Sequence, residues 1–121
     1  MKFSAINIRP FIGAKDYELS RAFYRVLDFE EIELSEKMCL YKVNDTLGFY
    51  LQKYYVKNWV DNSMVFLEVE DIELCEKELS KKALPEKFKH VKISKIMSYN
   101  WGREIFLHDP SGVLWHFCQF I

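Results

Sequence analysis

The chain has 121 residues and a mass of 14.6 kDa, which allows one ordinary domain or two half-size modules that share one core. Half of the residues are hydrophobic and 17% are aromatic, so the chain can build a core and is unlike a disordered or low-complexity protein. Seventeen basic and eighteen acidic residues give a net charge of −1, which argues against a nucleic-acid partner.

The sequence also bears on the compartment in which the protein works. It holds no apolar run of the roughly 20 residues that cross a bilayer, so we expect no membrane partner. The segment 1–10 carries a charge within its apolar stretch, unlike a signal peptide. Cys39, Cys75 and Cys118 are odd in number and form no CxxC pair. We therefore expect free thiols and a cytoplasmic location.

The first half of the chain predicts a strand, a helix and three further strands. Ile6, Ile8 and Ile12 alternate with their neighbours, and this period of two predicts a strand. Asp16 stands as the N-cap of a helix whose apolar stripe includes Phe23. Strand candidates follow at 29–34, 38–43 and 47–54, with a turn at 44–46.

The second half repeats this order of elements. A strand candidate at 64–69 leads to Asp71, the N-cap of a second helix, which we expect to end at Pro85 because proline cannot continue a helix. Strand candidates follow at 91–96, 101–108 and 113–120, with a turn at 109–112. The repeat predicts a single α+β domain over 1–121, formed by duplication, with module one at about 1–55 and module two at about 62–121. Two unrelated α+β halves are the rival interpretation.

Three segments resemble the signature of the vicinal-oxygen-chelate superfamily, which includes glyoxalase I, extradiol dioxygenases and bleomycin-resistance proteins. They are AFYRVLDF at 22–29 after Asp16, LEVEDI at 67–72, and FLHDPSGVLWHF at 106–117. Their order and separation cover nearly the whole chain, and they resemble most closely the metal-free, bleomycin-resistance-like members. Asp28 departs from the pattern, because the family usually has glycine there, and we expect this change to alter only a turn.

The resemblance implies two tandem βαβββ modules whose curved mixed sheets form a shared cleft, with the helices on the convex side. The alternation along each strand then divides the residues between the helix side and the cleft. Residues expected on the helix side are Ile6, Ile8, Ile12, Leu47, Phe49, Leu51, Val65, Leu67, Val69, Val113, Trp115 and Phe117.

Metal-using members of this family place one ligand on each of four strands. By resemblance, the four positions hold Arg9, Tyr50, Met64 and His116, or Gln52 in place of Tyr50 if the register slips by two. Arg9 has no lone pair to donate and carries a fixed positive charge, and Met64 offers only a soft thioether. His116 is therefore the only plausible metal ligand. We expect no cofactor, with a divalent metal as the alternative.

The resemblance implies a small-molecule binding protein that holds an aromatic or anionic organic ligand in the cleft without a metal. The candidate ligand-binding residues are Arg9, Phe11, Tyr50, Gln52, Trp59, Met64, Phe66, Trp101, Arg103 and His116. Arg9 can hold a ligand carboxylate or form an ion pair with Glu68, and the two roles are compatible.

Two other functions compete with this one. The first is a metal-dependent lyase, isomerase or dioxygenase of the same superfamily, and the second is a non-catalytic regulatory domain. The sequence assigns no catalytic residue, so it does not decide whether the chain is an enzyme. The resemblance further implies a homodimer, because relatives of this size commonly complete their clefts by dimerising.

Overall fold

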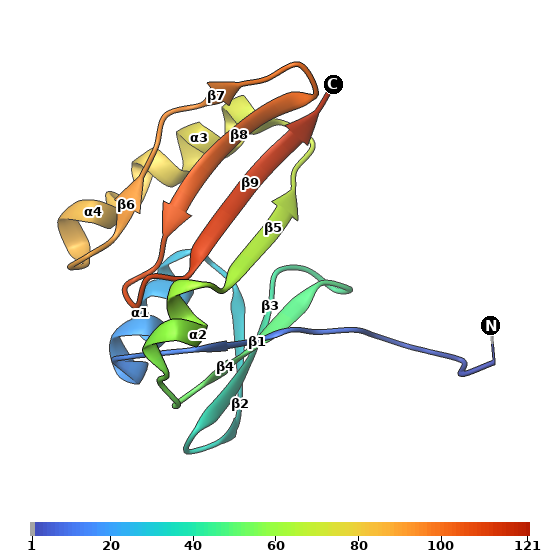
Figure 1. Cartoon of the computed structure of the whole chain (residues 1–121), viewed down its shortest axis with the longest axis vertical. Helices are drawn as coiled ribbons and strands as arrows, with labels where there is room; N and C mark the ends of the chain where they lie inside the picture. Colours follow the sequence, from blue (N-terminus) through green and yellow to red (C-terminus); the bar gives the residue numbers. More distant parts are fainter. Residues whose placement is uncertain (1) are drawn as a thin grey trace.

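The computed structural model describes residues 2–121 and divides them into two modules, each a mixed sheet with a helix against one face (Figure 1). The first module contains β1 (Phe11–Gly13), α1 (Tyr17–Val26), β2 (Glu30–Ser35), β3 (Met38–Lys42) and β4 (Gly48–Gln52). Its sheet, here sheet A, has the order β1-β4-β3-β2, and β1 runs parallel to β4. This is the predicted βαβββ order.

The second module repeats the arrangement. It contains β5 (Met64–Glu68), α3 (Ile72–Lys81), α4 (Leu84–Lys87), β6 (Lys92–Ile93), β7 (Met97–Ser98), β8 (Gly102–His108) and β9 (Leu114–Phe120). Its sheet, here sheet B, has the order β5-β9-β8-β6, with β7 also paired to β8 and β5 parallel to β9. The tandem α+β fold predicted from the sequence is confirmed.

The two long helices begin at the predicted aspartates. The side chain of Asp16 accepts a hydrogen bond from the backbone N–H of Leu19 at 3.1 Å, which satisfies a donor that the first helical turn leaves free. Asp71 does the same for Glu73 and Leu74, each at 3.1 Å. Each helix then buries its apolar stripe on its own sheet.

One buried polar cluster ties the two modules together. The hydroxyl of Tyr24 on α1 donates a hydrogen bond to Asp109 at 2.6 Å and accepts one from the indole N–H of Trp115 on β9 at 3.0 Å. Asp109 also accepts backbone hydrogen bonds from 111–113, and burial raises its pKa in spite of these partners. Phe49 packs edge-on against Trp115, so the modules share one core.

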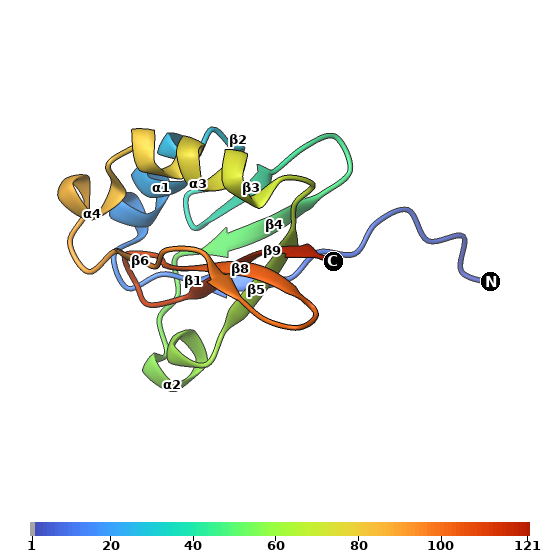
Figure 2. The same cartoon turned by 90° about the horizontal axis from the view of Figure 1, so that it is seen from above.

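The N-terminal strand is shorter than predicted. Residues 2–8 extend away from the body of the protein (Figures 1 and 2), and Phe3, Ile6 and Ile8 are 86%, 95% and 94% exposed. The expectation that Ile6 and Ile8 pack under a helix is therefore wrong. Strand pairing with β4 begins only at Phe11. Leu47 is also wrongly placed, since it lies in the β3–β4 turn and is 47% exposed.

Three short elements also differ from the prediction. The expected loop before β5 contains a short helix, α2 (Lys57–Asp61), which buries Val60. Helix α3 ends at Lys81, and Pro85 lies in the first turn of the separate helix α4 instead of ending α3. Of the strand expected at 91–96, only β6 (Lys92–Ile93) forms, and β7 (Met97–Ser98) lies just after that range. Within residues 2–121, no helix has the length and apolar character needed to cross a membrane.

Candidate functional site

Sheet B leaves one broad face uncovered, opposite to the face that packs on α3. The strand register aligns Phe66 of β5 with His116 of β9, and His116 with Phe106 of β8. The next row aligns Glu68, Cys118 and Glu104. We call this surface the sheet B face. As predicted, Met64 and Phe66 are exposed while Val65 and Leu67 pack against the core.

His116 is the best-defined polar side chain of the sheet B face. Its Nδ1 atom contacts the carboxylate of Glu104, a residue that is only 5% exposed. Its Nε2 atom lies 3.3 Å from the thioether sulfur of Met64. The imidazole ring stacks on Phe66 with a centroid separation of 6.1 Å and meets the edge of Phe106 at 5.3 Å. One nitrogen is thus fixed by a buried carboxylate, and the other lies beneath a flexible side chain.

Sheet A carries a second cluster, formed by Arg9, Phe11 and Tyr50. The rings of Phe11 and Tyr50 stack with a centroid separation of 4.7 Å. The guanidinium of Arg9 lies 5.9 Å from the Tyr50 ring centroid, and its Nη1 donates a hydrogen bond to the Tyr50 hydroxyl at 3.3 Å. The Nε of Arg9 is buried and has no hydrogen-bond partner among residues 2–121. An acceptor is therefore missing at this atom.

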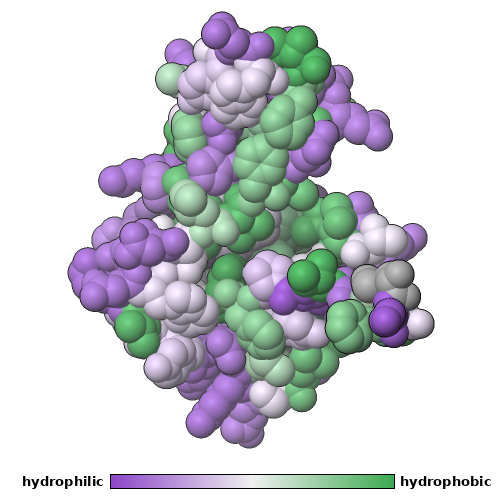
Figure 3. Space-filling view, turned by 45° about the vertical axis from the view of Figure 1, so that its right-hand side comes forward, coloured by the Kyte–Doolittle hydropathy of each residue, from purple (hydrophilic) through white to green (hydrophobic). Residues whose placement is uncertain are grey.

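A cavity of about 580 Å³ lies between the modules. The β3–β4 turn contributes Leu47, and β4 contributes Gly48. Strand β5 contributes Met64, Phe66 and Glu68, and the N-terminal segment contributes Ile8 and Pro10. Figure 3 shows apolar side chains, in green, around this hollow. Of the four positions implied by the resemblance, only Met64 lines the cavity; Arg9, Tyr50 and His116 lie outside its lining.

Several candidate residues lie elsewhere. Arg103 points to the helix side of sheet B, where it forms an ion pair with Glu73 of α3, so the expectation that it faces the cleft is wrong. Trp59 lies in α2 and packs beside Tyr54, with ring centroids 6.0 Å apart. Arg9 contacts Tyr50, and it forms no ion pair with Glu68 in the described part of the chain.

The remaining candidates lie near the ends of their strands. Gln52 closes β4 and pairs with Gly13 and Met38. Trp101 is 46% exposed just before β8 and stacks on Tyr99 at 5.1 Å. Tyr50 is half-buried on β4, and its hydroxyl accepts a hydrogen bond from Arg9.

Three residues of the sheet B face were not predicted from the sequence: Glu104, Phe106 and Phe120. A period of two from Gly102 places Glu104 and Phe106 on one face of β8, and the hairpin turn at 109–112 sets which β9 residues they adjoin. The alternation along β8 is visible in the sequence, but the identity of the neighbouring β9 residues follows only from the register of the β8–β9 hairpin.

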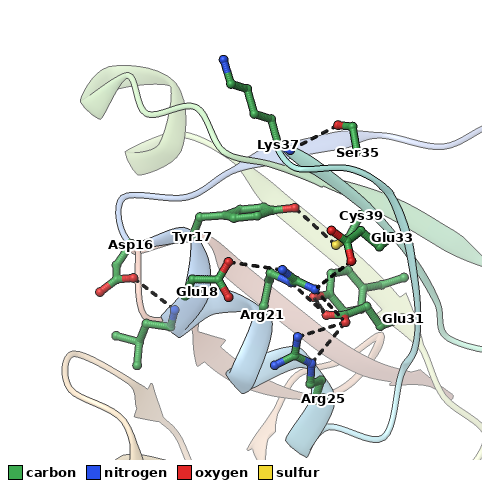
Figure 4. Close-up of polar contacts among 12 residues, drawn as sticks. Asp16, Tyr17, Glu18, Arg21, Arg25, Glu31, Glu33, Ser35, Lys37 and Cys39 are labelled. Atoms are coloured by element: carbon green, nitrogen blue, oxygen red, sulfur yellow. Dashed lines mark hydrogen bonds and ion pairs between the residues drawn. The ribbon is translucent and has the colours of Figure 1, made fainter.

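A separate polar network lies between α1 and sheet A (Figure 4). Arg21 and Arg25 on α1 both donate hydrogen bonds to Glu31 on β2, and the hydroxyl of Tyr41 donates another. Partial burial alone raises the pKa of Glu31, but these hydrogen bonds outweigh it and lower the pKa to about 2. The side chains satisfy one another on the helix-covered side, so this network holds α1 in place.

No family model and no curated protein sequence matches the chain. Solved structures do match. The bleomycin-binding protein of Streptomyces verticillus, solved with copper(II)-bleomycin, is 18% identical with a TM-score of 0.77, covering 94% of this chain and 95% of that one. The chain has the fold of the bleomycin-binding proteins. The resemblance read from the sequence is confirmed at this level.

Two further structures place the same fold in a resistance protein and an enzyme. A bleomycin resistance determinant encoded on the transposon Tn5 is 17% identical with a TM-score of 0.74, covering 95% of this chain and 98% of that one. A lactoylglutathione lyase from Agrobacterium tumefaciens is 16% identical with a TM-score of 0.71, covering 98% and 96%. The same fold therefore occurs in binding proteins and in enzymes. Whether this chain binds or catalyses must be argued from its own side chains.

Proposed function

We propose that the protein binds a small aromatic or anionic organic molecule without a metal, in the manner of the bleomycin-resistance proteins. The observation that supports this most directly is that the buried Nε of Arg9, beside the stacked rings of Phe11 and Tyr50, has no hydrogen-bond acceptor within residues 2–121. A planar ligand can stack on these rings, and its carboxylate or sulfonate can accept from the guanidinium. Phe66 and Trp101 add exposed aromatic surface on sheet B.

The structural neighbours support the same proposal. Two of them were solved with bleomycin or copper(II)-bleomycin bound, and they match nearly the full length of this chain. The three unpaired cysteines, two of them buried, are consistent with a reducing, cytoplasmic setting, which we also propose.

The rival is a metal-dependent lyase, isomerase or dioxygenase. A catalytic zinc or iron site usually needs three protein donors with an open position. Within residues 2–121, no three His, Cys, Asp or Glu side chains converge in this way. The positions implied by the resemblance supply a guanidinium, a phenol, a thioether and one imidazole, and this set does not fit a divalent metal.

Ligand titration tests the binding proposal. We expect metal-free bleomycin, or planar aromatic carboxylates, to quench the tryptophan fluorescence saturably in the presence of a chelator. Arg9→Ala should weaken binding about tenfold or more, because one charge-assisted hydrogen bond is lost. Lys37→Ala is the matched control, since it removes one exposed positive charge and should leave the affinity unchanged.

Two results would count against the proposal. One is an affinity unchanged in the double variant Arg9→Ala/Trp101→Ala. The other is stoichiometric Zn, Ni, Fe or Mn in the purified protein, detected by elemental analysis and lost on His116→Ala, which would establish the metal-dependent rival.

We further propose that the protein is a homodimer in which the N-terminal segment 2–10 of one copy lies along β5 of the other. Strand β5 is at the edge of sheet B, and an open strand edge accepts another extended chain. The segment offers Phe3, Ile6 and Ile8, and β5 offers Met64 and Phe66, which are 65% and 50% exposed.

Charge and symmetry support a second copy as the occupant of this edge. Lys2 of the segment is complementary to Glu68 at the end of β5 and to Glu70 just after it. Ile8 and Pro10 line the same cavity as β5, so the base of the segment lies beside the edge that would receive its counterpart. A two-fold exchange therefore closes on itself and covers the apolar groups of both copies.

A further inference from the structure

A second cavity lies beside the start of α1 and shares no lining residue with the cavity between the modules. Its volume is about 590 Å³, within the range of about 300–1,000 Å³ that small-molecule sites occupy. Module one contributes Lys15, the first turn of α1, and Lys53, which follows β4. Module two contributes Lys89 and His90 after α4, and Pro110. We call this hollow the α1 cavity.

Contacts between the modules fix the walls of the α1 cavity. The backbone N–H of Lys15 donates a hydrogen bond to the hydroxyl of Ser111 at 2.9 Å, which holds the chain before α1 against the turn at 109–112. Pro110 in that turn is buried and Leu19 on α1 is half-buried, so these two side chains provide an apolar wall. The cavity is therefore preformed, and a ligand need not order a loop in order to bind.

Three lysine side chains without ion-pair partners surround the cavity. Lys15, Lys53 and Lys89 form no ion pair within residues 2–121, whereas three other lysines do. They come from three different loops, so their positive charges lie around the cavity instead of along one element. An ammonium group is a compact charge with three hydrogen-bond donors and no acceptor, which suits it to phosphate oxygens. The imidazole of His90 adds a further N–H donor.

The two carboxylates that also line the α1 cavity have partners of their own. Asp16 accepts a hydrogen bond from the backbone N–H of Leu19 at 3.1 Å. Glu18 accepts one from the guanidinium of Arg21 at 3.2 Å. Even when both carboxylates are counted in full, the three ammonium groups outnumber them, so the cavity favours an anion.

The charge along the chain is unevenly distributed, and this places the excess of lysines near the cavity. Segment 81–95 contains one acidic residue, Glu86, although the whole chain carries a net charge of −1. Its six lysines are Lys81, Lys82, Lys87, Lys89, Lys92 and Lys95. Helix α4 of this segment lies on the same side of the molecule as α1 (Figures 1 and 2). The α1 cavity is where this segment meets the lysines of module one.

We propose that the α1 cavity binds a small phosphorylated organic molecule, whose phosphate or diphosphate group is held by Lys15, Lys53 and Lys89. The organic part of the ligand packs against Leu19 and Pro110. A multiply charged anion suits the cavity better than a monocarboxylate, because three ammonium charges face it. A nucleic-acid strand suits it less well, because the three lysines surround one hollow and form no stripe along the surface. The inference goes beyond the proposed function, since the two sites share no residue.

Calorimetric titration with inorganic pyrophosphate at low ionic strength tests the anion site. We expect saturable binding with one site per chain. Lys53→Glu/Lys89→Glu should weaken this binding about tenfold or more, because two attractive charges become repulsive. Lys92→Glu/Lys95→Glu is the matched control, because it makes the same change of charge at exposed lysines of segment 81–95 that lie outside the cavity. The control should weaken binding less than about twofold.

A second pair of probes tests the organic part of the ligand. Phenyl phosphate should bind more tightly than inorganic phosphate, because its ring packs on the apolar wall formed by Leu19 and Pro110. The reverse order of affinities would overturn the assignment to an organic ligand.

Three results would overturn the anion site itself. They are the absence of saturable pyrophosphate binding, equal weakening in the two charge-reversal variants, and binding of duplex DNA that both variants abolish. The last result would assign the lysines to a nucleic-acid surface.

If a variant does not fold, amide NMR of the intact protein titrated with pyrophosphate still decides the question. The shifts should concentrate at residues 17–19, 89–90 and 111, and shifts spread evenly over segment 81–95 would contradict the site. The binding proposal is tested separately. Arg9→Ala should leave the affinity for pyrophosphate unchanged, and Lys53→Glu/Lys89→Glu should leave the quenching by planar aromatic carboxylates unchanged.

Discussion

At the scale of single residues, Glu31 shows how the polar side of α1 is fixed. Its carboxylate lies 3.1 Å from Nη2 of Arg21 and 3.0 Å from Nη2 of Arg25, and the hydroxyl of Tyr41 donates a further hydrogen bond to it (Figure 4). The glutamate side chain is only 18% exposed, so the ionised form depends on these partners. Its charge therefore couples the attachment of α1 to pH.

We predict that the protein loses stability as the pH falls from about 4.5 to about 2. The folded-state pKa of Glu31 is lowered, so its contribution is present above the ordinary pKa and is lost as the pH falls through the folded value. After allowance for solvent screening this contribution is about 1–2 kcal/mol. Urea unfolding at pH 7 and near pH 3 measures it.

Glu31→Gln should remove this part of the pH dependence, whereas Glu33→Gln should keep it. Glu33 is the matched control because it faces the same Arg21 but is 57% exposed and 3.8 Å away. Equal pH dependence in wild type and Glu31→Gln would show that other groups govern the loss.

At the scale of elements, the C-terminal end of α1 depends on one left-handed residue. Asp28 has a φ of 65°, a conformation that costs most L-residues roughly 1–2 kcal/mol and costs glycine little. The departure from the family pattern at this position therefore falls where glycine fits best. The ion pair of Asp28 with Lys82 offsets little of this conformational cost, because the Asp28 side chain is 82% exposed and solvent screens the pair.

We predict that Asp28→Gly raises the free energy of unfolding by about 0.5–1 kcal/mol, whereas Asp28→Val lowers it by about 1–2 kcal/mol. The reason is the backbone conformation and not the lost charge. Asp28→Asn, which also loses the charge but tolerates the left-handed region, should stay within about 0.5 kcal/mol of wild type. Urea denaturation of the three variants decides between the two causes, since a charge effect would make Asn and Gly behave alike.

Strands could be predicted from the sequence where the alternation of apolar and polar residues coincides with burial of one face of the strand. Strands β3, β5, β8 and β9 lie within two residues of their expected bounds because helix-side residues such as Trp115 and Leu67 must be buried. Ile6 and Ile8 show the same alternation but pair with no strand within residues 2–121, so the pattern alone predicted a strand where the protein has an exposed segment. His116 was named from the sequence as a candidate ligand-binding residue, but its contact with Glu104 depends on cross-strand register, which the sequence alone does not give.

At the scale of the whole molecule, the two modules are joined by Tyr24, Asp109 and Trp115. We predict that Tyr24→Phe lowers the free energy of unfolding by about 1–3 kcal/mol, because it leaves the buried Asp109 and the indole N–H each without one partner. Tyr50→Phe, which removes a half-exposed hydroxyl on sheet A, should cost less than about 1 kcal/mol and serves as the control. Urea unfolding followed by tryptophan fluorescence gives both values. Equal losses of unfolding free energy in the two variants would contradict the role of Tyr24 in joining the modules.

The exposed N-terminal segment determines the last prediction, which concerns assembly. If segment 2–10 pairs with β5 of a second copy, introducing charge into its apolar side chains must weaken the dimer, because each buried aliphatic group is replaced by a carboxylate. We predict that the wild-type protein is a dimer by light scattering and that Ile6→Asp/Ile8→Asp is monomeric at the same concentration.

Leu74→Asp serves as the matched control for this double variant. Leu74 is an apolar residue of α3 that is 54% exposed and lies outside both the segment and the β5 edge, so its substitution should leave the dimer intact. Dissociation by both substitutions would point to general repulsion between charged copies, and a monomeric wild-type protein would contradict the exchange. Loss of the dimer in the double variant alone would support the exchange. Slower oxidation of Met64 in the wild-type dimer than in the monomeric double variant would then locate the segment on β5, because that strand carries the side chains which the segment must cover.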